Sequence, residues 1–127
     1  HVGDSRVYRV RAGRLDRLTR DHSWVEEQVR AGLISARAAF GHPRRHLLTR
    51  ALTGGEDPAS DFGWAPLAPG DALLLCSDGL CGVLDDRQIG AVLAESAGAG
   101  EDAGEALVAA ANHAGGPDNI TVILVRL

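Results

Sequence analysis

A run of five apolar residues, Ala72–Cys76, is followed directly by Ser77-Asp78-Gly79. A run of this length predicts a buried strand and is far shorter than the ~20 apolar residues that cross a bilayer. Serine, aspartate and glycine favour turns, so the strand should end sharply at this point. The sequence therefore predicts a sheet in which one acidic side chain, Asp78, lies where a buried strand ends.

The remaining pattern mixes short strands with short helices. Arg6–Val10 and Arg14–Leu18 alternate on either side of Ala12-Gly13, which predicts a β-hairpin. Further predicted features are helices capped by Ser23, by Ser35 and by Asp85 or Asp86, a helix with Leu107, Ala110 and Ala111 on its apolar face, a strand-length run at Leu47–Leu52, a loop over residues 53–60 and a strand at Ile120–Val125. This order predicts an α+β fold, with an antiparallel sheet covered by helices.

These elements form a thin core, because several strands have no evident second partner within 127 residues. A sheet that lacks its cover is unstable alone. The chain also contains no methionine. We therefore expect it to be a piece of a larger domain.

Composition excludes several functions. All 13 basic residues are arginine, so the chain has no lysine for a Schiff base or a phosphate loop. A net charge of −4 argues against general nucleic-acid binding, and no segment is apolar enough to span a membrane. Cys76 and Cys81 are too few for a disulfide framework, and we expect two buried thiols in a reducing cytoplasm.

Three aspartates lie next to predicted strands. Asp4 precedes the first strand, Asp78 follows the buried one, and Asp118 precedes the last. Each could simply form a turn. A carboxylate at the end of an apolar strand nevertheless needs a partner, which could be backbone amides, an arginine or a metal ion. Carboxylates from two strands suit Mg²⁺ or Mn²⁺, which prefer oxygen ligands. Both interpretations remain open from the residues alone.

Seven short motifs taken together resemble a known family. In chain order they are Gly3-Asp4-Ser5-Arg6-Val7-Tyr8, Leu18-Thr19-Arg20-Asp21-His22-Ser23, His42-Pro43-Arg44-Arg45, Leu48-Thr49-Arg50-Ala51-Leu52, Pro69-Gly70-Asp71, Leu75-Cys76-Ser77-Asp78-Gly79-Leu80 and Gly116-Pro117-Asp118-Asn119-Ile120-Thr121-Val122. Each is weak alone, but their order resembles the C-terminal half of the PPM-type (type 2C) metal-dependent serine/threonine protein phosphatases of bacteria. The resemblance covers essentially all of residues 1–127.

The resemblance implies an α-β-β-α sandwich that holds two Mn²⁺ or Mg²⁺ ions, with a third in some bacterial members. It implies hydrolysis of phosphoserine and phosphothreonine in protein substrates by a metal-activated water. By position, Asp78 and Asp118 resemble ligands of the binuclear centre, and Asp4 resembles the ligand of the third metal. The segment from about Asp21 to Arg50 resembles the flap that borders the active site.

One residue departs from the family pattern. His46 stands where the family usually has asparagine or serine near the third metal, and a neutral histidine could still bind manganese. The family's first half, with its bridging aspartate, phosphate-binding arginine and general acid, has no counterpart here. No catalytic residue can therefore be mapped, and we expect the chain alone to be inactive. The alternatives are a pseudophosphatase or regulatory interaction module, and a structural domain whose aspartates form turns.

Overall fold

The computed structural model describes residues 1–55, 59–100 and 102–127. The chain forms two compact units, which are considered separately below. The helical unit comprises residues 1–5 and 20–63, and the sheet unit comprises residues 6–19 and 64–127. None of the helices formed by the described residues is long and apolar enough to cross a membrane.

The sheet unit is built on four antiparallel strands. They are β1 (Arg6–Arg11), β2 (Arg14–Arg17), β3 (Ala72–Cys76) and β4 (Val122–Arg126), in the order β2-β1-β3-β4. The hairpin is confirmed, with its turn at Ala12-Gly13. A strand was predicted at Ile120–Val125, but β4 begins two residues later, at Val122. The backbone N–H of Thr121 is not part of the strand ladder, because it donates to the Ser77 hydroxyl.

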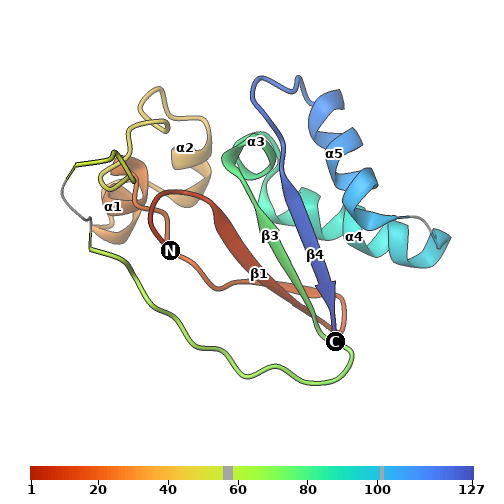
Figure 1. Cartoon of the computed structure of the whole chain (residues 1–127). Helices are drawn as coiled ribbons and strands as arrows, with labels where there is room; N and C mark the ends of the chain where they lie inside the picture. The colour runs from red at the N-terminus through yellow and green to blue at the C-terminus, as the bar shows by residue number, and fades with distance from the viewer. Residues whose placement is uncertain (56–58, 101) are drawn as a thin grey trace. The chain divides into compact units, whose positions relative to one another are not determined.

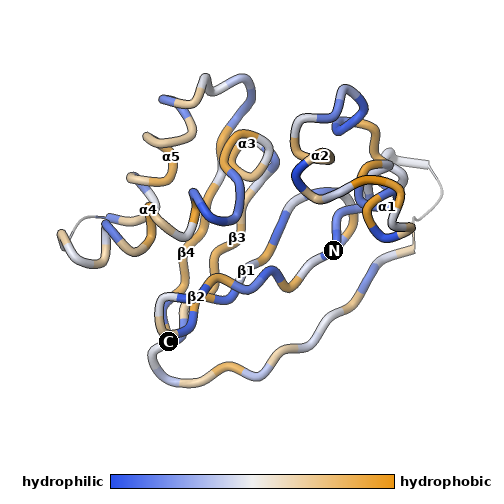
Figure 2. The backbone as a smooth tube through the Cα atoms, turned by 180° about the vertical axis from the view of Figure 1, so that it is seen from behind, coloured by the Kyte–Doolittle hydropathy of each residue, from blue (hydrophilic) through white to orange (hydrophobic). Residues whose placement is uncertain are grey.

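Three helices follow β3 in the sheet unit: α3 (Asp78–Cys81), α4 (Asp86–Ala99) and α5 (Ala103–His113). Helices α4 and α5 pack against each other, and contact β2 and β4 respectively (Figure 1). The core between helices and sheet contains fully buried Tyr8, Leu74, Leu80, Ile89 and Leu107. In Figure 2 the backbone of β3 and β4 is mainly orange, the colour of hydrophobic residues. The predicted α+β fold, an antiparallel sheet with flanking helices, is confirmed.

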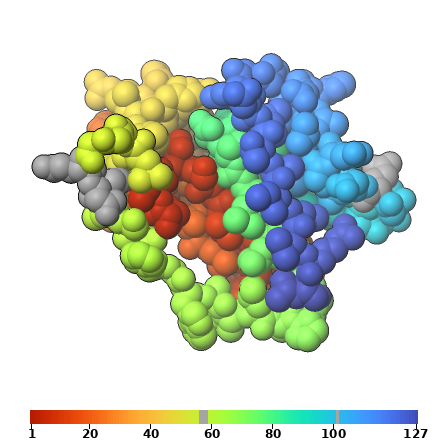
Figure 3. All heavy atoms as spheres, viewed as in Figure 1, coloured from red at the N-terminus to blue at the C-terminus, as the bar shows by residue number. Residues whose placement is uncertain are grey.

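The two faces of this sheet differ in their cover. Leu74 and its cross-strand partner Leu124 face the helices. Their neighbours point to the other face, because side chains alternate along a strand. On that face Ile123 is 55% and Val125 45% exposed, and no helix formed by the described residues of this unit covers them. Figure 3 shows β4 running along the surface of the molecule.

A partly buried polar network connects β1 to α4. The Tyr8 hydroxyl donates to Asp86 Oδ1 at 2.8 Å, and the guanidinium of Arg6 donates to the Tyr8 oxygen at 3.0 Å. Burial raises the pKa of the Tyr8 phenol well above its usual range. The capping box that opens α4 uses Asp85, whose carboxylate accepts from the Gln88 backbone. The sequence predicted either Asp85 or Asp86 as the cap of this helix, and in the structure the cap is Asp85.

The Pro69-Gly70-Asp71 motif holds the start of β3. Asp71 is only 3% exposed, and its carboxylate accepts from Arg11 Nε at 2.7 Å, Arg11 Nη2 at 2.6 Å and the Ala68 backbone at 2.8 Å. Hydrogen bonding from Arg11 lowers the pKa of the Asp71 carboxyl to about 2. A bidentate arginine–carboxylate pair is among the stronger polar contacts in proteins.

This pair predicts a loss of stability in acid. The folded-state pKa of Asp71 lies below its ordinary value of 3.8, so its contribution is complete above about pH 4 and is lost as the pH falls towards about 2. We expect the melting temperature of Asp71→Asn to be lower than that of the wild type at pH 6, and to fall less between about pH 4 and 2. Thermal melts of the two proteins across this range test it, and parallel pH profiles would contradict it.

The helical unit has two helices, α1 (Trp24–Arg30) and α2 (Ala36–Phe40). Both predicted caps are confirmed, since the Ser23 and Ser35 hydroxyls accept from backbone N–H groups at 3.3 and 3.1 Å. The predicted strand at Leu47–Leu52 is wrong. This segment forms one isolated bridge, Ser23 with Leu48, because no strand among the described residues extends beside it. The predicted loop over 53–60 includes residues 56–58, which lie outside the described residues.

Candidate metal site

The end of β3 and the start of β4 bring two predicted site residues onto neighbouring segments. Cys76 pairs with Val122 at the end of the ladder, so the residues that follow one strand and precede the other run side by side. Asp78 is the first residue of α3, and Asp118 lies four residues before β4. Both aspartates are exposed at this end of the sheet.

Ser77 ties the two segments together with three hydrogen bonds. Its backbone N–H donates to the Thr121 carbonyl at 3.1 Å, and its hydroxyl donates to the Asn119 carbonyl at 3.2 Å. The same hydroxyl accepts from the Thr121 N–H at 3.0 Å. Ser77 is thus a positioning residue, and no nucleophilic role is needed to explain it.

Gly79 allows the segments to approach even more closely. A Cβ placed on Gly79 would lie 2.1 Å from the Asn119 carbonyl oxygen and 3.2 Å from Ile120 Cα. Only glycine fits against this backbone. The Ser-Asp-Gly and Asp-Asn motifs, some 40 residues apart in sequence, therefore meet because of the residues that flank their aspartates.

The two carboxylates differ in their own contacts. Asp118 Oδ1 accepts from the backbone N–H of Asn119 at 2.7 Å, as in a turn. The Asp78 carboxylate forms no hydrogen bond or ion pair with any described residue. The interpretation that each aspartate stabilises a turn thus accounts for Asp118, whereas the carboxylate of Asp78 lies exposed in the first turn of α3. Two exposed oxygen donors on adjoining backbones fit a hard divalent cation.

Asp4 and His46 belong to the helical unit. Asp4 is half-buried after Gly3, whose φ of +101° favours glycine, and it takes part in a polar contact within the protein. His46 is exposed, and its imidazole forms no hydrogen bond or ion pair with the described residues. The structure therefore does not join His46 to Asp4, and the assignment of either residue to a third metal stays a prediction.

A cluster in the helical unit was not singled out from the sequence. Ligand atoms of His1, His22 and Asp61 all lie within 4.8 Å of one another. His22 is buried, its Nδ1 accepts from the Gly3 N–H at 3.1 Å, and its Nε2 lies 3.2 Å from Asp61 Oδ2. Hydrogen bonding from Arg50, and secondly from His22, lowers the pKa of Asp61 to about 2.

This cluster does not fit a metal ion. A metal-bound histidine normally donates a hydrogen bond from its other ring nitrogen, whereas Nδ1 of His22 accepts one. A neutral His22 therefore carries its proton on Nε2 and directs it towards the Asp61 carboxylate. The contact explains the Asp-His-Ser motif structurally, because His22 links the Gly3 turn to Asp61. The signal available in the sequence was the position of His22 directly before the helix cap Ser23.

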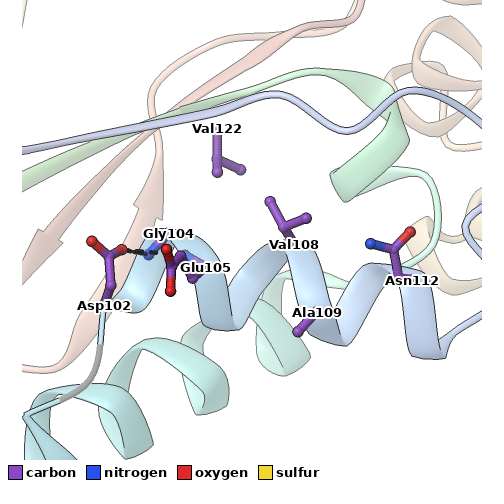
Figure 4. Close-up of a pocket in the computed structure, with 7 residues that line it drawn as sticks. All are labelled: Asp102, Gly104, Glu105, Val108, Ala109, Asn112 and Val122. Carbon is purple, nitrogen blue, oxygen red and sulfur yellow. Dashed lines mark hydrogen bonds between the residues drawn. The ribbon is translucent and has the colours of Figure 1, made fainter.

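One open pocket of about 520 Å³ lies along α5, and none of the predicted site residues lines it (Figure 4). Val108 and Asn112 project from the helix on the side of Val122. Asp102, at the end of the pocket, caps α5 by accepting from the Gly104 and Glu105 N–H groups. The carboxylate of Asp102 is therefore used in capping the helix.

Known proteins similar to the chain are serine/threonine phosphatases. Protein phosphatase PhpP from Streptococcus pneumoniae is 39% identical over 127 residues, which are 100% of this chain and 51% of PhpP. The PPM Ser-Thr phosphatase MsPP from Mycobacterium smegmatis, solved with cacodylate, matches with a TM-score of 0.82 and 43% identity over 99% of this chain and 53% of its own. The catalytic domain of the serine threonine protein phosphatase PstP, solved with 2 manganese ions, matches with a TM-score of 0.72 and 37% identity. This match covers 98% of this chain and 50% of the PstP chain.

No protein-family model matches the chain. The chain spans about half the length of the curated relatives it matches, consistent with the C-terminal half to which its motifs correspond. The resemblance seen in the sequence is confirmed: the chain is related, over its whole length, to about half of a PPM-type serine/threonine phosphatase domain.

Proposed function

We propose that residues 1–127 are the C-terminal portion of one PPM-type phosphatase domain, and that the complete protein hydrolyses phosphoserine or phosphothreonine in protein substrates. In this proposal the N-terminal half of the domain precedes the chain, and residues 21–50 form the flap. The relatives support it, since each is about twice as long as the match. The exposed apolar face of the sheet, with Ile123 and Val125, supports it as well, because such a face is stabilised when a second sheet covers it.

The observation that carries the metal proposal is the pair of exposed carboxylates, one of them without a protein partner, on segments that Ser77 and Gly79 hold together. We propose that Asp78 and Asp118 supply oxygen ligands to Mn²⁺ or Mg²⁺ in the complete domain. The manganese complex of PstP supports this choice of metal. When bound, such ions lower the pKa of a coordinated water and neutralise charge on phosphoryl oxygens.

The role of this chain is then to orient the ligands. Ser77 fixes the direction of α3, so Asp78 starts the helix on the side of the Asp118 loop. The backbone N–H of Asn119 holds one oxygen of Asp118 and leaves the other for a cation. Asp4 is proposed as a ligand of a third metal ion, and His46 as a residue near that ion in the complete domain. The bridging aspartate and the phosphate-binding arginine would come from the other half.

The test compares the complete protein with residues 1–127 alone, using release of phosphate from a phosphothreonine peptide. We expect turnover by the complete protein with Mn²⁺ or Mg²⁺, and none after chelation by EDTA, because the nucleophile depends on the ion. We expect no turnover by the 127 residues alone, because they lack part of the ligand set.

Each arm can fail separately. Turnover by the isolated chain would contradict the assignment as half a domain. Turnover in EDTA would contradict the metal. A complete protein that is inactive with either ion would contradict the phosphatase function and favour the alternative, a regulatory interaction module.

A further inference from the structure

Charge is distributed very unevenly along this chain. Residues 31–55, here called the cationic segment, contain four arginines, two histidines and no acidic residue, a formal charge of +4. The other 102 residues contain nine arginines and all 17 acidic residues, a formal charge of −8. A block of one sign in a chain of the other sign indicates a surface that attracts charged partners.

Three arginines of the cationic segment have no carboxylate partner among residues 1–55, 59–100 and 102–127. Arg37 is exposed at the end of α2, and Arg44 and Arg45 follow in the next loop. None of the three forms an ion pair with a carboxylate among the described residues. Arg45 Nε, although shielded from water, has no hydrogen-bond acceptor in the described part of the chain either. Arg50, the fourth arginine, already has a partner in the protein, because its Nη1 donates to Asp61 Oδ1 at 2.7 Å.

The loop holds one of these charges in a defined place. The Arg44 guanidinium carbon lies 5.1 Å from the centre of the Trp24 ring, and the His42 ring lies 5.1 Å from the same tryptophan. The Arg44 backbone N–H also donates to His42 Nδ1 at 3.1 Å. A cation stacked on an aromatic ring has less freedom to lose on binding, so an anionic ligand is bound at lower entropic cost.

The same segment exposes apolar side chains. Leu33 is 70%, Leu47 52% and Leu52 76% exposed, all within the helical unit. Exposed leucines between these arginines suit a peptide that carries both acidic and apolar residues. They suit a nucleic acid or an anionic membrane less well, because such extended polyanions would also meet the −8 charge of the rest of the chain.

We infer that the surface of Arg37, Arg44 and Arg45 recognises acidic residues that flank the phosphorylated residue of a protein substrate. This inference rests on the proposed phosphatase function, and it names the substrate class within it: phosphoproteins whose sites lie in acidic sequence. The surface acts on substrate binding and not on the chemical step, because exposed charges at the rim of an interface change association and its salt dependence.

The experiment uses the complete phosphatase and two phosphothreonine peptides of equal length. One has aspartate and glutamate around the phosphothreonine, and the other has asparagine and glutamine. We expect kcat/KM to be about tenfold higher for the acidic peptide, mainly through KM, since two or three exposed ion pairs together give an effect of this size. The preference should shrink towards 1 M salt, where the Debye length is about 3 Å.

Arg37→Gln combined with Arg44→Gln should bring the ratio of the two kcat/KM values close to one. The matched control is Arg14→Gln combined with Arg87→Gln, which removes two exposed arginines of the sheet unit and should keep the tenfold ratio. Melting temperatures of both double variants show whether each is folded. Equal kcat/KM for the two peptides in the wild type would overturn the inference, as would an equal loss of preference in both variants.

Two further measurements distinguish a failure of the proposed phosphatase function from a failure of the acidic-substrate inference alone. Hydrolysis of p-nitrophenyl phosphate, which has no flanking residues, reports on the catalytic centre; failure of every substrate contradicts the proposed function, whereas turnover without an acidic preference contradicts only this inference. Binding of a single-stranded oligonucleotide or of phosphatidylserine vesicles is measured with the same variants. If Arg37→Gln with Arg44→Gln abolishes that binding and leaves the peptide ratio unchanged, the surface serves another anion and the inference is wrong.

Discussion

If the proposed function holds, Asp78→Asn in the complete protein should lower kcat/KM for a phosphothreonine peptide by more than about 100-fold, because removing even a residue that only supports a metal ligand costs 10- to 100-fold. The fold should tolerate the change. The Asp78 side chain is exposed and has no polar partner among the described residues, so the amide replaces it without breaking a contact. In EDTA, we expect the free energy of unfolding to stay within about 0.5 kcal/mol of the wild type.

Metal-induced stabilisation gives a readout that does not depend on turnover. Adding Mn²⁺ should raise the melting temperature of the wild type, since a ligand that binds only the folded state stabilises it, and the rise should be lost in Asp78→Asn. Glu95→Gln is the matched control, an exposed carboxylate on α4 remote from the motif, and it should keep both turnover and the Mn²⁺-dependent rise. Near-normal activity of Asp78→Asn would refute the ligand role.

Gly79→Ala should destabilise the protein by about 3 kcal/mol, the upper end of the usual cost of overpacking a core. The added Cβ would lie 2.1 Å from the Asn119 carbonyl oxygen, and its neighbours there are backbone atoms that have no rotamer to change. Either the start of α3 or the Asp118 loop must move. Thermal or urea unfolding measures the cost, and phosphatase turnover should fall as well, because the separation of Asp78 from Asp118 changes.

Gly98→Ala provides the opposite expectation for the same chemical change. Gly98 is the next-to-last residue of α4, has no heavy atom within 4 Å of the added Cβ, and does not have a positive φ. Alanine there should stabilise the helix by about 0.5 kcal/mol, the lower end of the range for a helix interior. If the two alanine variants had similar stability, the close approach of Gly79 to Asn119 would not exist in solution.

Local signals in the sequence predicted most of the elements correctly. The Ala12-Gly13 turn predicted the hairpin, and Ser23 and Ser35 predicted two helix starts, because a cap depends on only three or four residues. A third start was predicted at Asp85 or Asp86, and the structure selects Asp85. The segment Leu47–Leu52 shows the limit of such signals. An apolar run forms a strand only if a partner lies beside it, and partners are decided by distant parts of the chain.

The site was predictable in part for the same reason. Asp78 and Asp118 could be chosen from their places beside strands, and the structure puts their segments together. The hydrogen bonds of Ser77 and the fit of Gly79 could not be predicted, because both depend on the backbone of Asn119 and Thr121, about 40 residues later. The role of His22 as the link between Gly3 and Asp61 likewise depends on a residue 39 positions away.

The pairing of β3 with both β1 and β4 has a consequence for folding kinetics. β3 joins a strand from the first 11 residues to one from the last six, so most of the sheet depends on contacts between residues far apart in sequence. Folds dominated by such contacts close large loops before they gain stabilising energy, and they fold slowly. Asp118 enters its place only when β4 docks. On a ribosome, the acidic end of the sheet would therefore be assembled only after residue 126 has been synthesised.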